Sequence, residues 1–140
     1  MRSYDRVFVD KREECVYNSN QERGEDMDSN ASLADVLAFL AHVKKLLAAG
    51  QYDFVPRRKN MMSLAACGLT IKDAKDEILG LTASDYYKGP KQDLDAKQPG
   101  DIWEFKKKIG SKQFYVKLKI QNRNGTDFLK CLSFHEDDFC

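Results

Sequence analysis

A carboxylate, a histidine and several lysines occur at alternate positions on segments that we expect to be neighbouring strands. Glu104 could take the proton from the 2′-hydroxyl of RNA. His135 could protonate the leaving 5′-oxygen, because histidine is a residue type that titrates near neutrality. Lys88, Lys106 or Lys117 would stabilise the charge that builds on the phosphate. These residue types predict acid–base cleavage of RNA without a metal ion or other cofactor, since no metal-ligand spacing is present in the sequence.

Two of these segments form a predicted β-hairpin. Residues 102–108 and 113–120 alternate apolar and polar side chains, and Gly110-Ser111 between them fits a two-residue turn. The turn fixes one register, which places apolar pairs on one face and polar pairs on the other. The predicted pairs are Trp103 with Leu118, Phe105 with Val116, Glu104 with Lys117, and Lys106 with Tyr115.

The chain turns again at residues 122–125, and a third strand is predicted at about 127–135. Leu132 and Phe134 are expected in the core, which would put the residues between and after them on the opposite face. The three strands then form an antiparallel meander with one face on the core and one on solvent. The predicted polar face carries Glu104, Lys106, Tyr115, Lys117, Lys119, Ser133 and His135.

A further candidate site lies at residues 80–89, where helical periodicity gives way to strand periodicity. Thr82 and Asp85 have the spacing of a helix-starting capping box, and we expect a turn to follow. The turn presents Tyr87 and Lys88, and an aromatic ring beside an ammonium suits a ligand that has a base and a phosphate. The alternative interpretation is a capped turn with two partly buried tyrosines.

Helices are predicted before this turn. Ser32 and Asp35 form another capping box, and a second helical segment is expected at about residues 57–66. Thr70 and Asp73 start a third, short helix. The apolar stripe expected to bury the first helix comprises Leu33, Val36, Leu37, Leu40, Val43 and Leu47.

The composition predicts one domain, residues 31–140, behind a polar extension, residues 1–30, that we expect to be partly disordered. The whole chain is nearly neutral, with 23 basic and 22 acidic residues. Residues 88–119, however, hold nine lysines against four acidic residues, which is typical of a site for nucleic acid or phosphate. A solvated, lysine-rich sheet edge would have the same composition.

The sequence has neither an apolar run long enough to span a membrane nor the features of a signal peptide. Its cysteines also lack the C-x-x-C spacing of common zinc sites, so we expect no disulfide framework and a location in the reducing cytoplasm. The four cysteines are Cys15, Cys67, Cys131 and Cys140.

The polar face also has a purely structural interpretation. Glu104 and Lys117 could be only a cross-strand ion pair, and His135 could be a strand-end residue beside an acidic tail. A module that binds RNA without cleaving it would carry the same residue types, and so would an interaction protein without affinity for RNA. The pattern by itself leaves these alternatives open.

Six short pieces, in order, carry a resemblance to a known family. They are VKKLLAAGQ (43–51), CGL (67–69), GLTASDYYK (80–88), DIWE (101–104), QFYVKLK (113–119) and SFHE (133–136). In these pieces the chain resembles the motility quorum-sensing regulator (MqsR) toxins of the RelE ribonuclease superfamily. The resemblance covers roughly residues 33–136.

The resemblance implies an α+β domain of RelE-like fold, with N-terminal helices packed on an antiparallel sheet that ends in the three-stranded meander. It also implies cleavage of mRNA, inhibition of translation and a cognate antitoxin. The family's active-site lysine falls on Lys88 and its tyrosine on Tyr115. Glu104 and His135 stand where the family pattern has glutamine and lysine, and they provide a better base and a better acid.

We therefore predict the toxin of a type II toxin–antitoxin system, a sequence-specific mRNA endoribonuclease that leaves a 2′,3′-cyclic phosphate. The alternative is a non-catalytic RNA- or protein-binding module on the same fold. The predicted catalytic residues are Lys88, Glu104, Tyr115 and His135, and the predicted RNA contacts are Tyr87, Lys106, Lys117 and Lys119.

Overall fold

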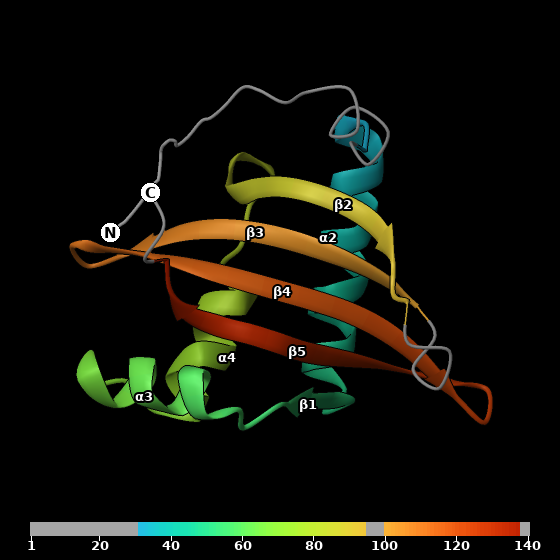
Figure 1. Cartoon of the computed structure of the whole chain (residues 1–140). Coiled ribbons are helices and arrows are strands. Elements are labelled where there is room, and N and C mark those ends of the chain that lie inside the picture. The colour runs from blue at the N-terminus through green and yellow to red at the C-terminus, as the bar shows by residue number, and fades with distance from the viewer. Residues whose placement is uncertain (1–30, 95–99, 138–140) are drawn as a thin grey trace. The chain divides into compact units, whose positions relative to one another are not determined.

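The computed structural model describes residues 31–94 and 100–137 (Figure 1), so the expected extension at residues 1–30 lies outside the described residues. Within them the chain forms three α-helices, one short 3₁₀ helix and a five-stranded sheet. None of these helices has the length and apolar character needed to cross a membrane. The elements are α2 (Leu33–Ala48), β1 (Tyr52–Phe54), α3 (Arg58–Ala66), α4 (Ile71–Leu79), η1 (Ala83–Asp85), β2 (Tyr86–Gln92), β3 (Asp101–Ile109), β4 (Lys112–Arg123) and β5 (Thr126–Glu136).

The sheet has the strand order β1-β5-β4-β3-β2. β1 runs parallel to β5, whereas the other neighbouring strands are antiparallel. The predicted α+β class is confirmed, but the sheet is not the purely antiparallel, three-stranded meander that the sequence predicts. The three predicted strands are β3, β4 and β5, and one further strand flanks them on each side (Figure 1).

The β3–β4 hairpin has the predicted register. Trp103 opposes Leu118, and Glu104 opposes Lys117. Phe105, Val116 and Leu118 on one face of the hairpin are buried in the core that this face forms with the helices. The hairpin thereby separates an apolar face from a polar one, as its alternation predicts.

Strand β5 differs from the prediction at Leu132. The register shifts there, so that Lys117 opposes Ser133 while Leu118 opposes Cys131, and Leu132 is the bulged residue. Cys131 therefore occupies the core position expected for Leu132, which is only partly buried. Beyond the bulge, Ser133 lies on the polar face, as predicted.

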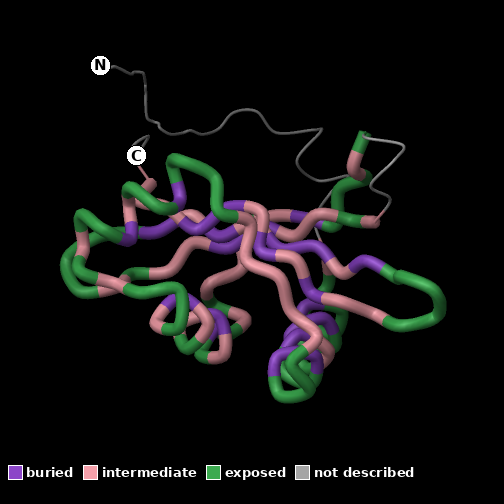
Figure 2. The backbone as a smooth tube through the Cα atoms, turned by 90° about the horizontal axis from the view of Figure 1, so that it is seen from below, coloured by how far each residue is buried: buried purple, intermediate pink, exposed green. Residues whose placement is uncertain are grey.

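α2 and α4 lie on one side of the sheet with their buried stretches facing it (Figure 2), whereas α3 packs against β5. Phe39 of α2 stacks on Trp103 with the ring centroids 4.3 Å apart. Because the sheet offers this aromatic partner, the buried stripe of α2 is centred nearer Phe39 than the sequence predicts. Leu33 and Leu37, expected in that stripe, are exposed by 65% and 51%.

The predicted helix starts are confirmed. The Ser32 side chain accepts a hydrogen bond from the Asp35 N–H at the start of α2. Thr70 and Asp73 form a reciprocal capping box at the start of α4. The Thr70 N–H donates to the Asp73 carboxylate and thereby lowers the pKa of that carboxyl.

Residues 86–92, whose first part was expected to be a turn, form the edge strand β2. Its pairing with β3 is irregular, with register shifts on both sides of Lys88, which opposes Glu104. Gly89 has a φ of +120°, and a Cβ atom there would lie 2.6 Å from the carbonyl oxygen of Ile102. Only glycine fits this position, because it allows both the backbone angle and the close approach of β2 to β3.

We predict that Gly89→Ala destabilises the domain by about 2 kcal/mol or more, because it combines backbone strain with a clash against β3. Thermal unfolding would show a drop of roughly 8 °C or more. Gly110→Ala is the matched control, since Gly110 also has a positive φ but a Cβ there meets nothing within 4 Å. Equal losses for the two variants would contradict the close approach at Gly89.

Candidate active site

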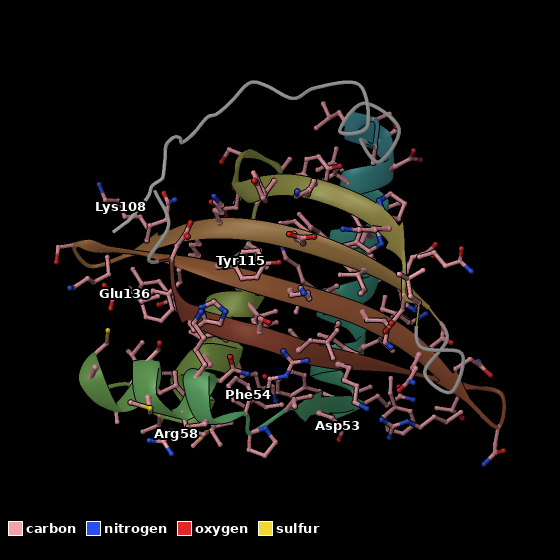
Figure 3. The ribbon with its side chains drawn as sticks, viewed as in Figure 1. Asp53, Phe54, Arg58, Lys108, Tyr115 and Glu136 are labelled. Carbon is pink, nitrogen blue, oxygen red and sulfur yellow. The ribbon has the colours of Figure 1, made fainter. Side chains whose placement is uncertain are left out.

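Seven of the eight predicted site residues come together on the face of the sheet that points away from the helices. Tyr115 projects from the middle of this face toward the viewer in Figure 3. Residues that oppose one another on neighbouring strands have Cβ atoms about 5 Å apart, so two short rows cross the sheet. One row is Lys88, Glu104, Lys117 and Ser133, and the other is Lys106, Tyr115 and His135.

Glu104 lies at the centre of the first row and is only 6% exposed. The Tyr115 hydroxyl donates a hydrogen bond to Glu104 Oε1 at 2.6 Å. Bonds of this kind to a carboxylate are short and strong, so the tyrosine fixes where the carboxylate points. Lys88 and Lys117 hold the opposing positions on the two neighbouring strands, so the carboxylate lies between two lysines.

Tyr87 provides an aromatic surface beside this row. This large aromatic residue is 45% exposed. Lys106 Nζ lies 4.2 Å from the centre of the Tyr87 ring, and Lys88 Nζ lies 5.1 Å from it. The two ammonium groups and the ring thus form one patch that combines positive charge with a stacking surface.

His135 lies next to Tyr115 in the second row. The two ring centroids are 5.4 Å apart. His135 Nδ1 is 3.0 Å from the carbonyl oxygen of Glu136. Since a carbonyl only accepts hydrogen bonds, this contact assigns the donor hydrogen to Nδ1.

Lys119 is the predicted site residue that the structure places apart. Its side chain is 1% exposed, and its Nζ lies 2.7 Å from Asp93 Oδ2. The ammonium is therefore buried beside a carboxylate that neutralises it, and it does not face solvent with the lysines of the two rows. The alternation of β4 predicts Lys119 on the polar face, but its ammonium is paired with Asp93 and its stem lies close to Gly100.

Between residues 31 and 137, apart from residues 95–99, no three His, Cys, Asp or Glu side chains group closely enough to hold a metal ion. Cys131 is buried in the core, and burial raises the pKa of its thiol, which keeps the sulfur protonated.

In a comparison with models of protein families, a family model matches residues 37–136. The family is described as motility quorum-sensing regulator, toxin of MqsA. The chain belongs to this MqsR toxin family. Its membership makes the chain a toxin of a toxin–antitoxin system, with an antitoxin as partner. A search of curated proteins found no match.

The family match spans both rows of the polar face, from Lys88 to His135. The resemblance inferred from six short pieces is thus confirmed. Sequence reasoning missed one residue behind this face, Asn60 of α3, which is fully buried and bonds to β5. The available signal was its spacing, because Asn60 lies one helical turn before the buried Leu64 and so falls on the inward side of its helix.

We predict that Tyr115→Phe lowers the free energy of unfolding by about 2 kcal/mol, because the buried Glu104 carboxylate loses its tyrosine donor. Chemical denaturation at neutral pH measures this loss. Tyr87→Phe removes the same atom from an exposed ring and should change stability by no more than about 0.5 kcal/mol. Equal, small effects of both variants would mean that the Tyr115–Glu104 bond contributes nothing to stability.

Proposed function

We propose that this MqsR-family toxin is a metal-independent endoribonuclease that cleaves mRNA in the cytoplasm and thereby inhibits translation. The observation that carries the proposal is the arrangement of a buried carboxylate, a tyrosine and a histidine on one face, with lysines around them. Glu104 and His135 are joined through Tyr115, which bonds to the first and packs against the second. A base and an acid on either side of one ring suit the two proton transfers of RNA cleavage.

In the proposed reaction Glu104 is the general base. Its ionised carboxylate takes the proton of the RNA 2′-hydroxyl, and the 2′-oxygen then attacks the neighbouring phosphorus. The Tyr115 hydroxyl holds the carboxylate in place. Because Glu104 is almost fully buried, only a ribose that is seated directly on this face can reach it.

His135 is the general acid. As the 5′-oxygen leaves the phosphorus, it receives a proton from the imidazolium, and the products are a 2′,3′-cyclic phosphate and a 5′-hydroxyl. The contact of Nδ1 with the Glu136 carbonyl leaves Nε2 as the nitrogen that transfers the proton. This assignment gives the ring one fixed orientation during the reaction.

Lysines and Tyr87 bind the rest of the substrate. Lys88 and Lys117 oppose Glu104, and they are placed to stabilise negative charge on the phosphate that is attacked. Tyr87 offers its exposed ring to a base, with Lys106 beside it for the adjoining phosphate. The single-stranded form of mRNA suits such a site, since its bases are free to stack.

The runner-up is a non-catalytic RNA-binding module with the same face. The exposed Tyr87 and its two ammonium groups favour this alternative equally, because stacking and phosphate contacts alone give binding. The two hypotheses differ only in what Glu104 and His135 do. Substitution of the acid and the base therefore separates them.

We predict that His135→Ala and Glu104→Gln each lower the cleavage rate by a factor of about 100 to 10,000, the usual contribution of a general acid or base. Single-turnover assays with a mixed-sequence RNA measure the rate. The chain has two histidines, and His42→Ala is the matched control, since His42 lies on α2 beside Asp127. Cleavage that survives both site substitutions, or is absent from the wild type, contradicts the enzyme hypothesis.

Binding of RNA should depend on salt through the lysines of the polar face. With His135→Ala as the background, the substitution of three lysines should reduce the slope of log K against log salt by about 2, at roughly 0.7 per phosphate contact. Fluorescence anisotropy of a labelled RNA measures the slope. The triple variant is Lys88→Ala, Lys106→Ala and Lys117→Ala, and the control of equal charge is Lys44→Ala, Lys45→Ala and Lys72→Ala on exposed helix surfaces.

Equal slopes for the two triple variants would mean that binding follows net charge and not this face. The absence of salt-dependent RNA binding before any lysine is replaced would favour a toxin whose partner is not RNA.

A further inference from the structure

The outer edge of β5 changes its partner halfway along the strand. Its first half pairs with β1, and the last backbone bond on this side runs from the Val55 N–H to the Cys131 carbonyl at 3.0 Å. Beyond this point β1 has ended, and α3 packs against β5 instead (Figure 1). An open strand edge needs other partners for its N–H and C=O groups.

Asn60 of α3 supplies these partners. Its Nδ2 donates to the Leu132 carbonyl at 3.1 Å, and its Oδ1 accepts from the Phe134 N–H at 3.0 Å. The side-chain amide thus offers a donor and an acceptor to alternate residues of β5, as the backbone of a further strand would. Nδ2 also donates to the Val55 carbonyl at 3.0 Å, which ties the end of the β1 segment to the same point.

Ser63, one turn further along α3, continues the pattern. Its Oγ accepts from the Glu136 N–H at 3.1 Å. Glu136 is also the residue whose carbonyl oxygen contacts His135 Nδ1. Asn60 and Ser63 therefore hold β5 on both sides of His135, at Phe134 and at Glu136.

The bulge at Leu132 gives these bonds a chemical consequence. A slip of one residue turns every side chain of a strand to the other face. The two bonds from the Asn60 amide lie at the bulge and directly after it. They therefore set the face on which Ser133 and His135 emerge beside Tyr115.

We propose that Asn60 is a positioning residue for the reaction, which acts by fixing β5 so that the His135 imidazole stays against Tyr115. This inference rests on the proposed function, in which His135 is the acid. Asn60 does not touch the polar face itself, because it bonds to the outer edge of β5 from the helix side and is 0% exposed. Ser63 is its auxiliary partner.

The test combines Asn60→Ala with a milder variant, Ser63→Ala, and a control, Leu64→Ala. Leu64 is buried in the same helix but packs in the apolar core, so its substitution destabilises the fold without removing a bond to β5. The geometric readout is the nuclear Overhauser effect between the ring protons of Tyr115 and His135. The kinetic readout is single-turnover cleavage of RNA, in the wild type and in the His135→Ala background.

We expect the nuclear Overhauser effect between the Tyr115 and His135 rings to weaken in Asn60→Ala and, to a smaller extent, in Ser63→Ala. It should persist in Leu64→Ala. The rate of cleavage by Asn60→Ala should fall by a factor on the order of 100, because a displacement of a catalytic group by about 1 Å lowers the rate by that much. In the His135→Ala background the Asn60 substitution should cause no further loss. If Asn60→Ala does not fold, the Ser63→Ala variant tests the positioning role with the same two measurements.

An unchanged ring contact in the folded variants would overturn the positioning role, whatever happens to cleavage. A further loss of cleavage in the His135→Ala background would overturn it too, because Asn60 would then act through another group. If the ring contact weakens but wild-type protein does not cleave RNA, the positioning of His135 stands and the proposed function fails. The two proposals are thus tested separately.

Discussion

The pairing of β3 with β4 is the constraint on which the rest of the structure depends. Because side chains alternate along a strand, the register that brings Phe105 and Val116 together under the helices also brings Glu104 and Lys117 together on the other face. The apolar side is held by the burial of aromatic rings such as Trp103 against Phe39. The free energy that stabilises the core therefore also sets the spacing of the polar rows.

Burial of a carboxylate is the unfavourable feature of this polar face. Water is largely excluded from Glu104, so the group depends on the Tyr115 hydroxyl and on cations from the neighbouring strands. A surface that served only for solubility would leave such a carboxylate in solvent. A carboxylate that is fixed by one strong bond and bordered by lysines fits a group that acts on a bound substrate.

The sequence predicted the features that strand alternation and helix capping determine. It missed the features that depend on contacts between residues far apart in the chain. The hairpin register followed from the residue types around a two-residue turn, and the polar rows followed from that register. Strand β1 was missed because its three residues are too few to show alternation. Leu132 was misplaced because alternation does not reveal the bulge in β5. The pairing of Lys119 with Asp93 was not foreseen either, since Asp93 lies far from it along the chain.

The most direct test of the central claim is the chemical nature of the ends produced from a mixed-sequence mRNA in the presence of EDTA. The account predicts discrete cuts that survive chelation and leave a 2′,3′-cyclic phosphate on one product and a 5′-hydroxyl on the other. These ends require attack by the 2′-oxygen, which is the step assigned to Glu104. Products with a 5′-phosphate and a 3′-hydroxyl, or cleavage that stops on chelation, would contradict the account.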